Sequence, residues 1–287
     1  MSHPTHILIT GANGQLGYEC RVLSSQYPQH NFSFVSRDQL SIDNKASVEK
    51  YFAENRVDVC INCAAYTAVD RAESDQANAY AINADAVASL AGICKQYSSA
   101  FVHISTDYVF DGSNKDGYKE TDATHPLNVY GASKLAGEQA ALTVNPGAII
   151  VRTSWVYSSF GNNFVKTMMR LMQEKPQIRV VADQIGRPTY AADLAAAIFD
   201  IVLREQKVSP GIYHFANEGV ISWFEFATEI KKIGGYSCEI IPISSAEYPV
   251  PAKRPSYSIL STDKIESIGI GLQSWKDSLQ KCMRLLQ

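Results

Sequence analysis

Tyr130 and Lys134 are spaced so that their side chains can act as one chemical unit. They lie four positions apart, and residues with this spacing share one face of a helix. An ammonium group beside the phenol ring would favour loss of the phenolic proton. The spacing therefore predicts a tyrosine that is tuned to donate a proton.

Thr106 is a hydroxyl group that can work with this pair. It follows the apolar run 101–105, and ligands of parallel sheets bind beyond the carboxyl ends of the strands. If hydride from a nicotinamide reduces a ketone, a hydrogen bond from Thr106 and a proton from Tyr130 stabilise the developing alkoxide, while Lys134 can hold the nicotinamide ribose. Tyr108 stands where a sugar dehydratase would carry an acid, which favours simple carbonyl reduction over elimination or epimerisation.

A glycine-rich turn near the start of the chain can bind phosphate groups. Gly11, Gly14 and Gly17 follow the β-branched run 6–10 and precede a helical pattern. Glycine lets the backbone approach a pyrophosphate, and the helix N-terminus offers free N–H donors and a favourable dipole. This position favours a dinucleotide site over a tight turn without a ligand. We expect cofactor contacts at Gly11, Asn13, Gly14, Gln15 and Leu16.

The residues after the second strand bear on the choice of cofactor. An NAD-selective site usually carries an acid here to hold the ribose 2'-hydroxyl, but this chain has Ser36 and Arg37, which could hold a 2'-phosphate. Arg37 could also be only solvated, and the acid Asp38 is compatible with NADH as the cofactor. The pattern therefore favours NADPH, with NADH as the alternative.

Composition narrows the class of protein. The chain has 287 residues, of which 46% are hydrophobic and 19% charged, enough for one large domain or two fused lobes. Its 26 basic and 29 acidic residues give a net charge of −3 without a basic run, so nucleic acid is not an expected partner. No apolar stretch approaches the roughly 20 residues of a membrane helix, and the N-terminus enters a strand at once. We expect no membrane partner, no signal peptide and a cytoplasmic location.

The six cysteines are scattered along the chain. Cys60 and Cys63 form a C-x-x-C pattern, but within a strand this spacing places the two side chains on opposite faces. Free thiols are therefore expected instead of a zinc site or a redox pair. We predict no metal ligands.

Short β-branched runs alternate with helical patterns in the first half of the chain, which is typical of a parallel sheet covered on both faces. The expected strands are 6–10, 32–36, 57–63, 101–105, 149–153 and a later one around 213–215. Helical patterns cover 77–97, 163–171, 193–203 and 275–285. These elements predict a doubly wound α/β sheet of the Rossmann type.

After Trp155 the pattern loosens, and no internal repeat is present. We expect a dinucleotide-binding domain from residues 1–160 plus about 190–218. A smaller substrate-binding lobe is expected from discontinuous segments, about 161–189 plus 219–287.

Several segments together resemble the extended short-chain dehydrogenase/reductase family, and more closely its dTDP-4-dehydrorhamnose reductases. They are 11–17, 62–73, 105–112, 130–134, 151–155, 183–189 and 254–255. The resemblance implies NAD(P)H-dependent reduction of the 4-keto group of dTDP-4-dehydro-L-rhamnose to dTDP-L-rhamnose, for surface polysaccharide biosynthesis. The implied partner is therefore a nucleotide-sugar substrate.

The resemblance also assigns individual residues. Catalytic positions match Thr106, Tyr130 and Lys134, and substrate contacts match Thr106, Asp107, Tyr130 and Trp155. Arg254 is expected to meet a nucleotide phosphate, since a guanidinium suits bidentate contact. Asn163 is a weaker substrate candidate whose alternative is a helix N-cap. Further cofactor contacts are expected at Ile42, Ala64, Ala65 and Tyr66, besides Tyr130 and Lys134.

Some questions stay open in the sequence. The family's Leu-Asp-Ile after the second strand is replaced by Ser41 before Ile42, so the adenine contact is uncertain. Some relatives are dimers with interface magnesium, and only Glu19 matches such a position, which leaves magnesium uncertain and the protein a monomer or a homodimer. The alternatives in function are a non-catalytic cofactor-binding subunit, like that of methionine adenosyltransferase, and a reductase of another nucleotide-linked keto sugar.

Overall fold

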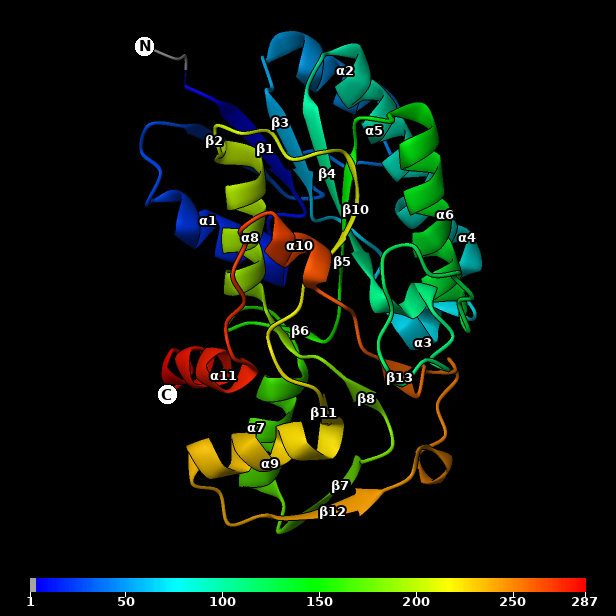
Figure 1. Cartoon of the computed structure of the whole chain (residues 1–287), viewed down its shortest axis with the longest axis vertical. Helices are drawn as coiled ribbons and strands as arrows, with labels where there is room; N and C mark the ends of the chain where they lie inside the picture. Colours follow the sequence, from blue (N-terminus) through cyan, green and yellow to red (C-terminus); the bar gives the residue numbers. More distant parts are fainter. Residues whose placement is uncertain (1–3) are drawn as a thin grey trace.

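A six-stranded parallel sheet forms the centre of the molecule in the computed structural model, which describes residues 4–287 (Figure 1). Its strand order is β2-β1-β3-β4-β5-β10, and every pairing in it is parallel. The strands are β1 (His6–Thr10), β2 (Asn31–Val35), β3 (Val59–Asn62), β4 (Ala100–Thr106), β5 (Ile149–Thr153) and β10 (Gly211–His214). The predicted doubly wound sheet is confirmed.

Helices cover both faces of this sheet because its strands are apolar on both sides. One face carries α1 (Gln15–Ser24), α8 (Ala191–Leu203) and α10 (Asp263–Ser267), and the other carries α2 (Lys45–Glu54), α5 (Ala86–Gln96) and α6 (Val129–Val144). Adjacent residues of β1 divide between the two cores: Ile7 and Ile9 face α1 and α8, whereas Leu8 faces α2 and α5. The alternation of side chains along a strand explains this division.

The predicted boundaries of the strands in the main sheet were close to the observed ones, whereas one predicted helix differed from the structure. The expected ranges 6–10 and 149–153 agree with β1 and β5, and the other strands shift by one or two residues at an end. The helical pattern 77–97 does not form one regular helix, because a π-helical turn at Ala81–Asp85 separates α4 (Gln76–Tyr80) from α5.

This turn creates a docking point for α6. A side chain at Gly137 of α6 would collide with the backbone oxygen of Asn83, so only glycine allows the close approach. The Asn83 amide then donates to the hydroxyl of Ser133, also on α6, at 3.0 Å. The π-helical turn therefore helps to fix the helix that carries Tyr130 and Lys134.

The remaining elements pack below the main sheet in Figure 1, and the C-terminus lies beside α11. Their shared core includes Val165, Phe226, Ile230, Leu279 and Met283, all fully buried. The elements are α7 (Phe164–Glu174), α9 (Trp223–Gly234), α11 (Trp275–Arg284), β6 (Val156–Tyr157), β7 (Gln177–Val181), β8 (Ile185–Gly186), β9 (Thr189–Tyr190), β11 (Ile221–Ser222), β12 (Glu239–Ile243) and β13 (Tyr257–Ser258). The short α3 (Val69–Ala72) lies near α6. The division into a cofactor part and a substrate part stays a prediction.

The cysteines and the surface agree with this layering. Cys60 packs with Cys94 in one core, while Cys63 packs against the other core, which contains Cys20, so the C-x-x-C side chains do point to opposite faces.

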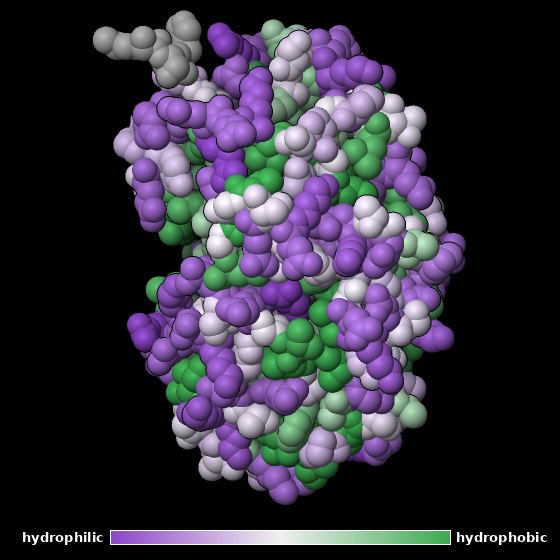
Figure 2. Space-filling model, in the orientation of Figure 1, coloured by the Kyte–Doolittle hydropathy of each residue, from purple (hydrophilic) through white to green (hydrophobic). Residues whose placement is uncertain are grey.

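Figure 2 shows a mostly hydrophilic face with an apolar patch in its lower half. Within residues 4–287, every helix falls short of the length and hydrophobicity needed to cross a bilayer.

A buried ion pair joins α6 to the sheet. Two nitrogens of the Arg152 guanidinium, in β5, donate to the two carboxylate oxygens of Glu138, at 2.9 and 2.6 Å, and the two side chains are 3% and 1% exposed. The Phe110 ring lies against the same guanidinium. Such a pair depends on both partners, because removing one leaves a buried charge without compensation.

We expect Glu138→Gln to destabilise the fold by about 3–5 kcal/mol, since the Arg152 charge would stay buried without a counter-charge. Urea unfolding followed by circular dichroism would measure the loss. The matched control is Glu174→Gln, which breaks the exposed pair with Arg170 and should cost about 0–1 kcal/mol. Equal losses in the two variants would contradict a special role for the buried pair.

Candidate active site

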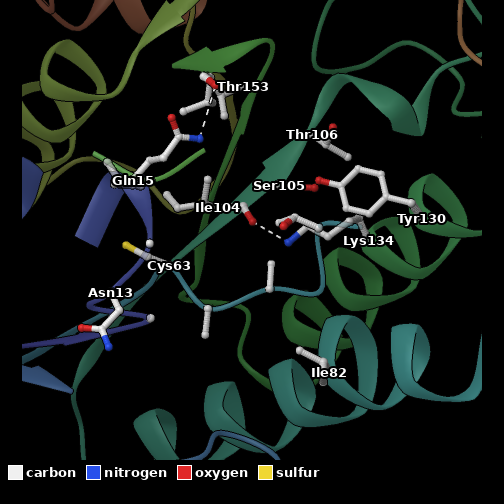
Figure 3. A pocket seen from close by; sticks show the side chains of 18 of the residues that line it. Asn13, Gln15, Cys63, Ile82, Ile104, Ser105, Thr106, Tyr130, Lys134 and Thr153 are labelled. Atoms are coloured by element: carbon white, nitrogen blue, oxygen red, sulfur yellow. Dashed lines mark hydrogen bonds between the residues drawn. The ribbon is translucent and has the colours of Figure 1, made fainter. Parts of the chain in front are cut away.

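A cavity of about 800 Å³ lies at the carboxyl ends of β1, β3, β4 and β5. The glycine turn, the strand ends and the start of α6 contribute to its wall (Figure 3). Two tryptophans, one shortly after β5 and one at the start of α9, also line it. The strand order reverses direction between β1 and β3, and ligands of doubly wound sheets bind at such a switch point. The cavity is therefore where the fold itself predicts a ligand.

The glycine turn forms one wall because larger residues would not fit. A Cβ atom at Gly11 would lie 2.6 Å from the backbone nitrogen of Ala64, and one at Gly17 would lie 2.5 Å from the Gly11 oxygen. Gly14 is the N-cap of α1 and has no side chain to occupy the first N–H groups. The helix N-terminus is therefore free to bind an anion. All five residues expected from this turn line the cavity.

Ser36, Arg37 and Ile42 line the cavity at the end of β2. The Arg37 side chain is 75% exposed, and its nearest acid is Asp43, at 3.8 Å. A pair this long and this exposed holds the guanidinium weakly. Arg37 can therefore turn to a phosphate group without a large penalty.

The catalytic candidates meet because α6 begins close to the end of β4. The side chain of Asn128 caps α6 by accepting from the N–H of Gly131 at 2.8 Å, and a side chain at Gly131 would collide with the backbone oxygen of Tyr108. This close approach places the Tyr130 ring next to Thr106 and against the Tyr108 ring, at a centroid distance of 5.7 Å (Figure 3). Thr106, Tyr130 and Lys134 all line the cavity, as do Asp107 and Trp155.

The expected effect of Lys134 on Tyr130 was wrong for this structure. The Lys134 amine donates to the Ile104 carbonyl at 2.6 Å (Figure 3) and lies 3.1 Å from Nε2 of His103. Burial raises the pKa of Tyr130 to about 12, and the nearby Thr106 hydroxyl offsets this only in part. Burial lowers the pKa of Lys134 to about 8. The phenol is therefore held protonated rather than acidified.

Asp107 is a buried carboxyl group at the same strand end. Its Oδ1 accepts from the Thr106 hydroxyl at 2.9 Å, whereas its buried Oδ2 has no hydrogen-bond partner within residues 4–287. Burial raises the pKa of Asp107 to about 6. A carboxylate kept this far from water is costly to the fold, which is typical of a group retained for function.

Trp155 shows backbone strain at the other end of the cavity. Its φ of +48° is rare for a bulky residue and persists only when the surroundings enforce it. Its ring stacks on that of Trp223 with 3.6 Å between centroids and 11° between planes, and a side chain at Gly186 would collide with the Trp155 ring. Trp223 also lines the cavity and was not predicted. The N-cap Ser222 places Trp223 at the first position of α9, but no local pattern marks it as a cavity residue.

Three predicted site residues lie outside the cavity wall. Tyr66 directs its hydroxyl to Asp75 at 3.0 Å, because its backbone is held by Asn83, although Ala64 and Ala65 do line the cavity. Asn163 is the N-cap of α7, so the helix-cap alternative is correct.

Arg254 is the third residue outside the wall. Its guanidinium forms two hydrogen bonds with the carboxylate of Asp70, at 3.0 and 2.8 Å, which lower the pKa of that carboxyl group. This pair connects α3 with the C-terminal segment. Arg254 does not bind at the cavity in this arrangement, and its phosphate contact stays a prediction.

The cavity also includes residues that the prediction missed. Thr153 ends β5 and is the register partner of Thr106, so the rule that ligands bind at the carboxyl ends of strands could have identified it. Leu194 lines the cavity from α8, and Val156 from β6. No local pattern marks these two, because they reach the wall only through the tertiary packing.

Glu19, the residue considered for magnesium, is buried and accepts from the Ser158 hydroxyl at 2.6 Å. Burial raises its pKa. Within residues 4–287, no cluster of three or more histidine, cysteine, aspartate or glutamate side chains is placed to hold a metal ion.

Comparison with known proteins identifies close relatives along the whole chain. The family described as RmlD substrate binding domain matches residues 5–287. A dTDP-4-dehydrorhamnose reductase of Aggregatibacter actinomycetemcomitans is 42% identical over 284 residues, covering 96% of this chain and 97% of the relative. The solved structure of such a reductase from Clostridium acetobutylicum has a TM-score of 0.94 at 40% identity and covers 99% of this chain and 100% of its own. Another, from Bacillus anthracis in complex with NADP, has a TM-score of 0.93 at 40% identity, covering 98% and 99%.

The buried Asp107 predicts a dependence of stability on pH. Because its pKa is raised to about 6, the folded protein binds this proton more tightly than the unfolded chain does between about pH 4 and pH 6. The ionised carboxylate therefore destabilises the fold above pH 6. We expect Asp107→Asn to raise the free energy of unfolding by about 2–3 kcal/mol at pH 7 and by little at pH 4.

Thermal unfolding at several pH values would measure this difference. Asp116→Asn, at an exposed position, controls for the loss of one negative charge. A constant difference between Asp107→Asn and the unchanged protein from pH 4 to pH 7 would contradict the raised pKa.

Proposed function

We infer the function from one premise, that the chain belongs to the dTDP-4-dehydrorhamnose reductase family. It is an NADPH-dependent oxidoreductase that reduces the 4-keto group of dTDP-4-dehydro-L-rhamnose to give dTDP-L-rhamnose. The observation that supports this proposal best is the single cavity in which the glycine turn meets Thr106, Tyr130 and Lys134. The proposed location is the cytoplasm, in keeping with six free thiols.

The residues at the glycine turn fit a dinucleotide. The space that Cβ atoms would fill at Gly11 and Gly17 lets a pyrophosphate approach the backbone, and the uncapped start of α1 provides N–H donors. NADPH, when bound, supplies the hydride. Ser36 and Arg37 would hold the 2'-phosphate, which is why we favour NADPH over NADH. A relative with 40% identity carries NADP in its crystal structure.

Tyr130 is the proposed proton donor to the oxygen of the reduced carbonyl group. Its raised pKa keeps the phenol protonated at neutral pH, so the proton is present when the alkoxide develops. The Thr106 hydroxyl would donate a hydrogen bond to the same oxygen. Lys134 would hold the nicotinamide ribose and stabilise the phenolate once Tyr130 has lost its proton.

The substrate would lie between the catalytic residues and the loops below the sheet. The stacked rings of Trp155 and Trp223 offer an apolar wall suited to the sugar. Arg254 would bind the diphosphate. To do so, its guanidinium must either break its two hydrogen bonds with Asp70 or keep one of them while it contacts the phosphate. In this proposal residues 1–160 and about 190–218 bind the cofactor, while about 161–189 and 219–287 bind the substrate.

We expect Tyr130→Phe to lower kcat by about 100-fold to 10,000-fold, because the phenol supplies the proton. The assay supplies the 4-keto sugar nucleotide and follows the absorbance of the reduced cofactor. Tyr108→Phe, which removes the neighbouring phenol, should cause a smaller loss. Full activity in Tyr130→Phe would rule out Tyr130 as the acid. If the protein does not reduce this substrate but reduces another nucleotide-linked keto sugar, the result supports a reductase of that other sugar. If it reduces none of these sugars, the result supports a non-catalytic cofactor-binding subunit.

We expect Arg37→Ala to raise KM for NADPH by about tenfold or more and to leave KM for NADH nearly unchanged, because only NADPH has the 2'-phosphate. Steady-state kinetics with both cofactors would measure the change. Arg56→Ala, at an exposed site away from the cavity, is the control. An unchanged preference for NADPH in Arg37→Ala would overturn this assignment.

A further inference from the structure

A chain of buried hydrogen bonds runs beneath the cavity to Lys134. Thr10 donates to Oδ1 of Asn62 at 2.6 Å, Nδ2 of Asn62 lies 3.0 Å from Nδ1 of His103, and Nε2 of His103 lies 3.1 Å from the Lys134 amine. These side chains come from β1, β3, β4 and α6, and each is at most 2% exposed. Because water does not reach them, every hydrogen in the chain must have a defined place.

The orientation of the Asn62 amide is set by the backbone. The N–H of Ala64 can only donate, and it meets Oδ1 of Asn62 at 3.2 Å. That atom must therefore be the amide oxygen, which leaves the NH2 group facing His103. The Thr10 hydroxyl donates to the same oxygen and agrees with this orientation.

The Asn62 amide in turn fixes the tautomer of His103. Since the NH2 group donates to Nδ1, that nitrogen must offer its lone pair, and the single proton of the neutral imidazole lies on Nε2. Burial lowers the pKa of His103 well below its ordinary value, so the ring is neutral. The Nε2–H therefore points at the Lys134 amine.

This arrangement favours the neutral form of Lys134. An ammonium group has only donors, so it cannot accept the His103 proton, whereas a neutral amine can accept it and still donate to the Ile104 carbonyl at 2.6 Å. We propose that His103 is a positioning residue that stabilises the neutral amine form of Lys134 in the free protein. The charged form that Lys134 needs in catalysis, which rests on the proposed function, then predominates only below about pH 8.

Other groups near Lys134 influence its pKa, some by raising it and some by lowering it. Glu138, one turn further along α6, and Cys63, after β3, favour the charged form, but the Glu138 carboxylate is already bound by the Arg152 guanidinium. Tyr130, one turn back on α6, is kept neutral by its raised pKa. Burial is the largest influence and lowers the pKa of Lys134 to about 8. A proton on Nε2 of His103, directed at the amine, would act in the same direction.

Nuclear magnetic resonance of the free protein tests the proposal directly. With 15N-labelled histidine, we expect Nδ1 of His103 to resonate as an unprotonated nitrogen and Nε2 as a protonated one. With 13C-labelled lysine, Lys134 should titrate at least about two pH units below the ordinary lysine value of about 10.4. The opposite tautomer, or an ordinary lysine titration, would overturn the proposal. Neither readout requires turnover, so failure of the proposed function would be seen separately.

The Asn62→Asp variant reverses the arrangement with almost the same shape. A carboxylate still accepts from Ala64 N–H but can only accept from His103, so the imidazole proton moves to Nδ1 and Nε2 accepts from an ammonium. We expect the tautomer to switch and the Lys134 midpoint to rise by about one to three pH units. The control Thr10→Val leaves Ala64 to hold the amide, so both readouts should stay unchanged. If the titration midpoint of Lys134 is unchanged in Asn62→Asp, or rises while the His103 tautomer stays the same, His103 does not control the protonation of Lys134.

Discussion

The docking of α6 against the carboxyl edge of the sheet is the constraint on which the site depends. Gly131 and Gly137 allow the approach, because side chains there would collide with backbone oxygens of neighbouring segments. The buried pair of Glu138 and Arg152 then fixes the helix against β5. Only after this docking do residues from separate parts of the chain share one cavity with the glycine turn.

The same docking changes the chemistry of the groups that it buries. Away from water the charged form is disfavoured, so the pKa values of Tyr130 and Asp107 rise and that of Lys134 falls. For a reductase this leaves a protonated phenol next to the Thr106 hydroxyl. The buried carboxyl group of Asp107, whose Oδ2 lacks a hydrogen-bond partner within residues 4–287, and the strained backbone of Trp155 show that the fold gives up stability at this cavity.

Much of the fold could be predicted because its signals are local. β-Branched runs and glycine spacing predicted the parallel sheet and the phosphate turn, and the rule that ligands bind at strand ends led to Thr106. Trp223 and Leu194 were missed, since they reach the cavity from distant segments that carry no motif. Arg254 was placed by resemblance alone, and its ion pair with Asp70 depends on a contact between residues 184 positions apart.

The sequence by itself determined the helix face that Tyr130 and Lys134 share, because a spacing of four residues fixes direction within one helix. It also determined the turn where only glycine fits. The tertiary structure alone decided what the Lys134 amine contacts, since His103 and Ile104 lie on a strand about 30 residues away. Burial and hydrogen-bond partners are properties of the assembled core, and they set the charge of a group whose identity the sequence had already specified.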